Sequence, residues 1–282
     1  MAKFTIVHMT NIRHFYIHIL IAIFFASFFS VSWAQDDSKK KKTTNVEFVV
    51  PEVMPDPVAP QARPDRHPGQ RNMPMLAARV ASEQLHGIDV SHYQGRINWD
   101  EVAKDPNVSY VYLKATEGVN TSDDTYRYNF RECKRVGLKV GSYLFFRPRL
   151  SAKAQFQHFM SMVDTKSQDL LPVIDAEVIK GVSVRAFQTR LLELCQLFEK
   201  EYGKKPIIYT GRNFYNKYIH GNSRLQTYKY FIASYTFEEP QLNGGKEYVM
   251  WQYTATGSVK GIRGDVDQSK LMGHHTLADI LY

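Results

Sequence analysis

From residue 86 onward, short β-rich runs alternate with stretches of helical periodicity, and this alternation restricts the fold more than any other feature of the sequence. Strands are expected at His86–Val90, Tyr110–Ala115, Lys139–Phe145, Leu171–Asp175, Pro206–Thr210, Tyr230–Ser234, Tyr248–Tyr253 and a short piece near Val266. Helices are expected at Trp99–Lys104, Asp124–Val136, Ala152–Val163, Val184–Tyr202 and Phe214–Ile219. Five β-α units followed by three strands predict an α/β fold, an irregular TIM-like β/α barrel of parallel type that is closed or nearly closed.

A doubly wound open sheet is the structural alternative for the same alternation of strands and helices. The nucleotide-binding version of that fold has a glycine-rich phosphate loop after its first strand, and no such loop follows Val90. Helix boundaries fit capping rules in either fold, since Ser151 and Ser183 precede two helices and Gly203 follows one. The barrel is therefore preferred, and it assigns residues 85–282 to one domain.

The first 84 residues lack this periodicity and predict two non-globular segments. Residues 1–34 contain no acidic side chain, place Lys3 and Arg13 before an apolar run, and end in Ser-Trp-Ala, which predicts a signal peptide cut after Ala34. An uncleaved membrane anchor at residues 15–34 is the alternative, because about 20 apolar residues span a bilayer. Residues 35–84 predict a Lys/Pro-rich disordered linker. We therefore expect an exported protein, secreted or held in the periplasm or cell envelope.

The charge and the cysteine content exclude several classes of protein. The net charge of +8 comes from 36 Lys+Arg against 28 Asp+Glu, and residues 1–82 and 83–282 share the excess equally. Neither part therefore has the dense basic face of a nucleic-acid binder. Cys133 and Cys195 show no metal-binding spacing and no disulfide framework. They are expected as buried thiols, and a single bridge in an oxidising compartment is left open.

Functional side chains of a β/α barrel stand at the carboxyl ends of its strands, and the clearest signal there is Asp175-Ala176-Glu177. An apolar run that predicts a buried strand ends in two acids, which alternation places on one face with α-carbons about 6.5–7 Å apart. Crowding pushes the pKa values of two carboxyls apart, so one is protonated while the other is charged, as glycoside hydrolysis requires. Alternatively, one acid caps a helix or pairs with Lys180 or Arg185.

Further acids and aromatic residues are expected at the same end of the barrel. Asp89 ends the first strand, Glu117 follows the second and Asp267 lies near the last. Singly, each acid fits a turn or an ion pair such as Glu117 with Lys114. Aromatic rings at strand ends fill a barrel or stack on sugar rings. These rings belong to Tyr143, Tyr209, Tyr235, Trp251 and Tyr253. The acids and the aromatic rim together favour a carbohydrate site.

A metal site has weak support in the sequence. His86, Asp89 and His92 suggest a metal-dependent deacetylase, but their i, i+3, i+6 spacing does not converge on one strand face. His274 and His275 are expected on the surface. The sequence has no Gly-x-Ser-x-Gly elbow and no convincing Cys–His pair, so nucleophilic acyl transfer is not supported.

Short stretches of the chain, taken in order, resemble the family 25 glycoside hydrolases, which are lysozymes also called N,O-diacetylmuramidases. They are Gly87–Ser91, Leu113–Gly118, Gly141–Tyr143, Phe145–Pro148, Val173–Glu177, Pro206–Thr210, Trp251–Tyr253, Gly261–Gly264 and Val266–Asp267. The resemblance covers the chain from about Leu85 to its end. The family often has a histidine where this chain has Leu144, so one sugar contact is expected to differ.

The resemblance implies hydrolysis of the β-1,4 bond between N-acetylmuramic acid and N-acetylglucosamine in bacterial peptidoglycan, without cofactor or metal. It implies that Glu177 is the general acid and that Asp175 assists, through the 2-acetamido group of the substrate or more directly. Asp89 and Asp267 complete the acidic set, with Asp265 the weaker match for the last position. The residues expected to bind substrate are Lys114, Glu117, Tyr143, Tyr209, Tyr235 and Trp251.

Two other functions are carried as alternatives, namely a catalytically silent peptidoglycan-binding protein and a metal-dependent polysaccharide deacetylase. Peptidoglycan glycan strands are the expected partner of both the hydrolase and the silent binding protein. The protein is expected to be a monomer. Retention or inversion at the anomeric carbon stays open, because carboxyl spacing suits inversion and neighbouring-group participation suits retention.

Overall fold

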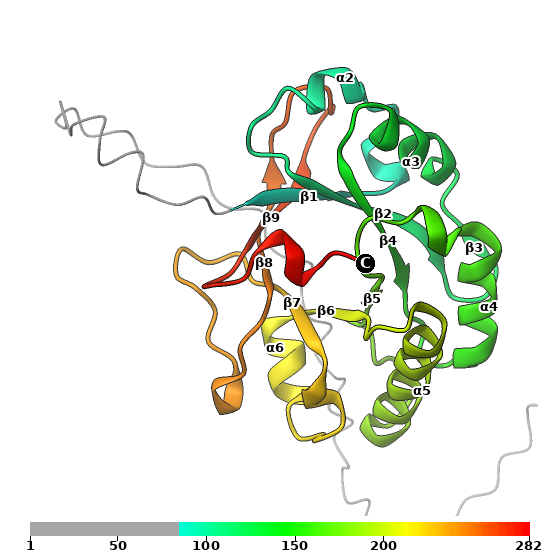
Figure 1. Cartoon of the computed structure of the whole chain (residues 1–282). Coiled ribbons are helices and arrows are strands. Elements are labelled where there is room, and N and C mark those ends of the chain that lie inside the picture. Colours follow the sequence, from blue (N-terminus) through cyan, green and yellow to red (C-terminus); the bar gives the residue numbers. More distant parts are fainter. Residues whose placement is uncertain (1–84) are drawn as a thin grey trace, which may run out of the picture. The chain divides into compact units, whose positions relative to one another are not determined.

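The computed structural model describes residues 85–282, which form a barrel of strands surrounded by helices (Figure 1). The predicted signal peptide at residues 1–34, its membrane-anchor alternative at residues 15–34 and the predicted linker at residues 35–84 lie outside the described residues. Cys133 and Cys195 are both buried and unbridged.

Eight strands close into a ring in the order β1, β9, β8, β7, β6, β5, β4, β2, and β2 pairs with β1 to complete it. The strands are β1 (His86–Val90), β2 (Tyr110–Glu117), β4 (Lys139–Phe145), β5 (Val173–Asp175), β6 (Ile207–Gly211), β7 (Lys229–Ala233), β8 (Met250–Gly257) and β9 (Val266–Leu271). The two-residue β3 (Thr121–Ser122) pairs with β2 outside the ring. The predicted closed barrel is confirmed, and the open-sheet alternative is wrong.

One strand departs from the predicted parallel arrangement. β9 runs antiparallel to both of its neighbours, β8 and β1, while the other neighbouring strands of the ring are parallel. Only residues 258–265 connect β8 to β9, and a parallel return needs a crossover of about a dozen residues or more. Because β9 is reversed, its first residues lie at the carboxyl end of the parallel strands.

The helices cover the barrel from β1 to β7, and β8 and β9 are joined without one (Figure 1). They are α2 (Trp99–Val102), α3 (Tyr126–Arg135), α4 (Ala152–Met162), α5 (Val184–Tyr202) and α6 (Arg212–Phe214), which continues into the π-helical turn η3 (Tyr215–Ile219). Short 3-10 turns are η1 (His92–Gln94), η2 (Thr165–Ser167), η4 (Leu225–Thr227), η5 (Asn243–Gly245) and η6 (Leu277–Asp279). The predicted caps are confirmed, because Ser151 and Ser183 accept backbone hydrogen bonds and Gly203 has a left-handed φ of 65°. Among residues 85–282, no helix combines the length and the apolar character needed to cross a bilayer.

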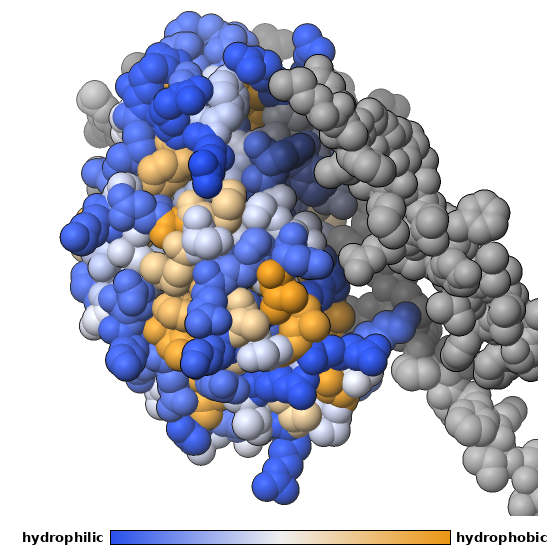
Figure 2. Space-filling model, turned by 90° about the vertical axis from the view of Figure 1, so that its right-hand side faces the viewer, coloured by the Kyte–Doolittle hydropathy of each residue, from blue (hydrophilic) through white to orange (hydrophobic). Residues whose placement is uncertain are grey.

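Apolar side chains form one layer between the strands and the helices and a second layer inside the barrel. Tyr110 and Tyr112 fill the interior because glycines face them. A Cβ on Gly87 would lie 2.3 Å from the Tyr110 ring, and a Cβ on Gly141 would lie 2.6 Å from the Tyr112 ring. The outer surface on the α4 and α5 side is mainly hydrophilic, with apolar side chains in small separate patches (Figure 2).

The C-terminal segment closes the amino end of the barrel. Leu171 N donates a 2.8 Å hydrogen bond to Ile280 O, and Leu170 forms an antiparallel bridge with Leu281. Ile280 is fully buried within the interior apolar layer, and the end of the chain lies over the barrel centre in Figure 1. The opposite, carboxyl end of the barrel is therefore the open one.

Candidate active site

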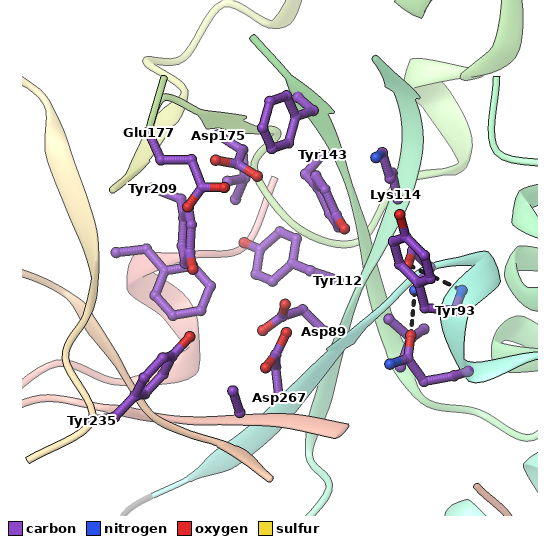
Figure 3. A pocket seen from close by; sticks show the side chains of 17 residues that line it. Asp89, Tyr93, Tyr112, Lys114, Tyr143, Asp175, Glu177, Tyr209, Tyr235 and Asp267 are labelled. Atoms are coloured by element: carbon purple, nitrogen blue, oxygen red, sulfur yellow. Dashed lines mark hydrogen bonds between the residues drawn. The ribbon is translucent and has the colours of Figure 1, made fainter. Parts of the chain in front are cut away.

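A pocket of about 340 Å³ opens at the carboxyl end of the parallel strands, lined by acids and tyrosines from many strands (Figure 3). It brings together these predicted residues: Asp89, Asp175, Glu177, Asp267, Lys114, Tyr143, Tyr209 and Tyr235. Glu117 and Trp251 do not line it. Tyr93, which was not predicted, lines its rim and is 81% exposed.

Asp175 ends β5, and Glu177 follows after the buried Ala176. Neighbouring strands hold this turn on both sides, because Phe146 N donates to Asp175 O and Ala176 N donates to Tyr209 O, each at 2.9 Å. Both acids face the pocket, as alternation along an extended backbone requires (Figure 3). Asp175 is only 8% exposed, whereas Glu177 is open to solvent in the pocket.

The environment favours the protonated form of both acids. Burial raises the pKa of Asp175 well above its usual value, and the charges of Glu177 and Asp89 raise it further. Within residues 85–282, the buried Oδ1 of Asp175 has no hydrogen-bond partner. Partial desolvation and the charge of Asp267 raise the pKa of Glu177. Glu177 is both protonated more readily than a free carboxyl and accessible, so it is the acid that can transfer a proton to a ligand.

Two cations beside this pair are held by Glu117. Its carboxylate accepts from Lys114 Nζ at 2.8 Å and from Arg147 Nε at 3.0 Å. Both cations also lie over the Phe145 ring, at 5.2 Å and 4.5 Å from its centroid. Their charges oppose the rise in the pKa of Glu177. Glu117 therefore acts on the pocket through Lys114 and Arg147, and Arg147 was not predicted from the sequence.

Asp89 and Asp267 face each other across the antiparallel β1–β9 pair (Figure 3). Each carboxyl affects the ionisation of the other. Burial and the charge of Asp267 raise the pKa of Asp89 well above its usual value, and burial raises the pKa of Asp267 to about 6. Both acids of this pair are therefore protonated more readily than free carboxyls.

Gln252 connects this acid pair to the tyrosines, and sequence reasoning did not select it. Its Nε2 donates to Asp89 Oδ1 and Oδ2 at 3.1 Å and 2.9 Å. Its Oε1 accepts from Tyr209 OH at 2.9 Å and from Tyr235 OH at 2.8 Å. The side chain is 1% exposed, so these bonds fix its amide orientation. The sequence signal that could have identified Gln252 is its position two residues after Met250, because alternation places both side chains on the interior face of β8.

Two residues named from the sequence point away from the pocket. Trp251 is 5% exposed, belongs to the outer apolar layer and donates from Nε1 to Ser234 O at 2.7 Å. Leu144 is fully buried in the same outer layer. Because Leu144 is on the opposite face of β4 from Tyr143, the departure from the family pattern at this position leaves the pocket lining unchanged.

The histidines near β1 do not gather around a common point. His86 Nδ1 lies 3.1 Å from Tyr253 OH, and His92 Nδ1 lies 3.0 Å from Asp123 Oδ2. Among residues 85–282, the side chains close enough to share a cation are Glu247, His274 and His275, far along the chain from β1.

Comparison with known proteins gives consistent results. The model of "Glycosyl hydrolases family 25" matches residues 88–262. The uncharacterized protein YegX of Escherichia coli K12 is 35% identical over 204 residues, which cover 71% of this chain and 74% of that protein. Lysozyme M1 of Streptomyces globisporus is 33% identical over 201 residues, covering 67% and 68%. The crystal structure of a bacterial lysozyme from Streptomyces coelicolor superposes with a TM-score of 0.62 at 31% identity, covering 68% of this chain and 94% of that one.

Proposed function

This chain belongs to glycosyl hydrolase family 25 and is a glycoside hydrolase, and we propose that it cleaves the β-1,4 bond between N-acetylmuramic acid and N-acetylglucosamine in bacterial peptidoglycan. Its similarity to lysozymes supports this substrate. The observation that carries the proposal is the Asp175–Glu177 pair, in which a buried and an accessible carboxyl face one pocket.

In this proposal, Glu177 is the general acid that protonates the glycosidic oxygen as the bond to the anomeric carbon breaks. Its raised pKa keeps a larger fraction protonated near neutral pH than a free glutamate would. Its exposure in the pocket lets a sugar oxygen approach the carboxyl. The charge of Asp267 raises that pKa and so supports the acid role.

Asp175 assists by orienting the 2-acetamido group of the substrate and accepting its N–H, while the acetamido oxygen attacks the anomeric carbon and the protonated leaving sugar departs. Water then attacks the same carbon, breaks its bond to the acetamido oxygen and returns a proton to the Glu177 carboxylate. When Glu177 is protonated, the repulsion between the two carboxylates is relieved, and Asp175 can carry the charge. Lys114 and Arg147 further favour that charge. The unpartnered Oδ1 supports this role, because a buried oxygen without a donor gains most from a ligand N–H.

The remaining pocket residues bind the glycan. Tyr143, Tyr209 and Tyr235 present ring faces and hydroxyls to the sugars, and Lys114 contacts their polar groups. Glu117 holds Lys114 in place, and Trp251 supports the pocket from behind β8. Because peptidoglycan lies outside the cytoplasm, the proposal also requires export, in agreement with the signal peptide expected at residues 1–34.

The test is to digest purified peptidoglycan with the protein, reduce the soluble products with borohydride and identify the new sugar alcohol by mass spectrometry. Muramitol ends, absent with Glu177→Gln, are expected. Glucosaminitol ends would mean that the opposite glycosidic bond is cut. Retained binding with no new ends would identify a silent binder, and acetate release that stops with a chelator would identify a deacetylase.

A further inference from the structure

At the amino end of the barrel, remote from the active-site pocket, two chain segments lie side by side. β8 begins opposite the end of β9, with Met250 paired to Leu271, and Met272 N donates to Val249 O at 3.0 Å. The residues just before β8 and just after β9 therefore converge. They line a separate pocket of about 200 Å³.

Three potential metal ligands meet at this pocket. One ligand atom from each of Glu247, His274 and His275 lies within 4.8 Å of the other two. Gly273, with a left-handed φ of 55°, turns the chain after β9 so that the two imidazoles follow it as neighbours. Their ring centroids are 4.6 Å apart. We propose that Glu247, His274 and His275 form a binding site for Zn²⁺, outside the active site.

The donor set selects the metal. Two imidazole nitrogens and one carboxylate are typical zinc ligands, whereas Ca²⁺ and Mg²⁺ prefer sites made of oxygen atoms. Zinc bonds of about 2.0–2.1 Å place tetrahedral ligand atoms about 3.4 Å apart, a spacing that side chains with ligand atoms within 4.8 Å of one another reach by small rotations. Glu247 and His274 are exposed, so burial does not oppose this adjustment. A water molecule completes the tetrahedron.

A carboxylate that can support the site from its outer shell lies beside His275. His275 Nδ1 lies 3.7 Å from Asp279 Oδ1 and has no hydrogen-bond partner among residues 85–282. A carboxylate at this nitrogen favours the tautomer with its proton on Nδ1, leaving Nε2 as the ligand. Asp279 is held in turn, because its Oδ2 accepts from Thr276 N at 2.9 Å. Lys246, the lysine that lines the pocket, is turned toward Gln226 O, to which its Nζ donates at 2.9 Å.

Zinc at this site would join the segment before β8 to the C-terminal segment that closes the barrel through Ile280. Because the metal binds only the folded arrangement tightly, its binding free energy adds to the stability of the fold. The active-site pocket lies at the other end of the barrel, so hydrolysis itself does not depend on this metal.

The test is isothermal titration calorimetry of the chelator-stripped protein with ZnCl₂, with the thermal midpoint recorded in parallel. We expect one Zn²⁺ per chain and a rise of about 5–10 °C at a free Zn²⁺ concentration 100-fold above Kd. His274→Ala and Glu247→Gln should each weaken binding at least about tenfold. His158→Ala, at a half-buried histidine on α4 far from this pocket in the sequence, is the control and should bind like the unmutated protein. Co²⁺ should show the visible absorption of a tetrahedral nitrogen and oxygen site.

Equal Zn²⁺ binding by the His274→Ala and His275→Ala double variant would overturn the proposal, as would the absence of any binding at millimolar ZnCl₂. Circular dichroism of each variant verifies that it is folded. If the double variant does not fold, His274→Ala alone tests the site, because the His274 side chain is exposed and its loss should not disturb the fold. Hydrolysis of peptidoglycan should continue in the presence of a chelator. A failed zinc site and a failed hydrolase proposal are therefore separable.

Discussion

The two ends of the barrel are built from the same strands and have opposite chemistry. At the carboxyl end, Asp89, Asp175 and Asp267 crowd together in a pocket, and their pKa values are raised by burial. At the amino end, the interior is apolar and is closed by the buried Ile280. Crowded, desolvated acids destabilise a fold, whereas apolar burial stabilises it. The comparison indicates that one end of this barrel maintains the structure and the other end carries the function.

The same division between structural and functional residues occurs within single strands. In β5, Val173 belongs to the apolar interior layer where it meets the pocket, and Asp175, two residues further along, adds a carboxyl to the pocket lining. In β8, Met250 belongs to the apolar interior layer, and Gln252, two residues further along, hydrogen-bonds the pocket residue Asp89. Mutations at these paired positions should therefore separate loss of activity from loss of stability.

The largest expected effect is on catalysis. Glu177→Gln should reduce kcat by about 10²–10⁴-fold, because it removes the proton donor. It should leave the free energy of unfolding unchanged or raised, because it also removes a charge from a crowded group. The measurements are the rate of peptidoglycan cleavage and urea unfolding. Glu193→Gln, an exposed carboxylate on α5, is the control and should change neither. Retention of a tenth or more of the activity would contradict the acid role.

The opposite result is expected at the closed end. Ile280→Ala should lower the free energy of unfolding by about 2–5 kcal/mol, because it opens a cavity in the interior layer. Well below the unfolding midpoint, kcat should stay within about twofold of the unmutated value. Leu277→Ala, at a half-buried position nearby, should cost less. A large fall in kcat with unchanged stability would break the division between the two ends.

Gln252→Leu should affect both properties. It leaves the Asp89 carboxyl and the hydroxyls of Tyr209 and Tyr235 without their partner, at a cost of about 1–3 kcal/mol in stability. We expect a decrease in kcat of about tenfold, because the acid pair loses its fixed geometry. Met250→Leu on the same face of β8 conserves volume and should cost less than about 1.5 kcal/mol with full activity. Equal behaviour of the two variants would show that Gln252 has only a packing role.

The pH dependence of the free energy of unfolding should reflect the crowded acids at the carboxyl end of the barrel. Burial raises the pKa of Asp267 from 3.8 to about 6, so between these values the native state binds more protons than the unfolded state. The free energy of unfolding therefore falls as pH rises from about 4 to 6. Asp267→Asn should remove that part of the fall, about 3 kcal/mol at pH 7. Asp265→Asn, at an exposed neighbouring position, should keep it. A variant curve parallel to the unmutated one would contradict this assignment.

The smallest effect is expected at the pocket rim. Tyr93→Ala should raise KM about 3–10-fold with little change in kcat, because an exposed ring beside the pocket contributes about 0.5–1.5 kcal/mol of stacking. Phe237, in the loop after β7, is even more exposed than Tyr93 but does not line the pocket. Its alanine variant should leave KM unchanged. Initial rates over a range of soluble glycan concentrations distinguish the two.

Prediction from the sequence worked where local rules apply and failed where the register of distant strands decides. The Asp175–Glu177 pair was placed on one face correctly, because alternation is a property of the extended backbone itself. The same rule did not say whether the odd-numbered or the even-numbered residues of β8 face the interior. Trp251 was therefore predicted to bind substrate, whereas Gln252 is the residue that points inward. Arg147 was missed because only the folded chain brings its side chain to Glu117.

The sequence by itself determined the order of strands and helices, the caps of α4 and α5, and the acids at the strand ends. These follow from side-chain periodicity and backbone stereochemistry over a few residues. Only the tertiary structure decided the direction of β9, the contact of Asp89 with Asp267, and the meeting of Glu247 with His274 and His275. Each of these depends on closing the barrel, because strand pairing joins residues that no local pattern relates.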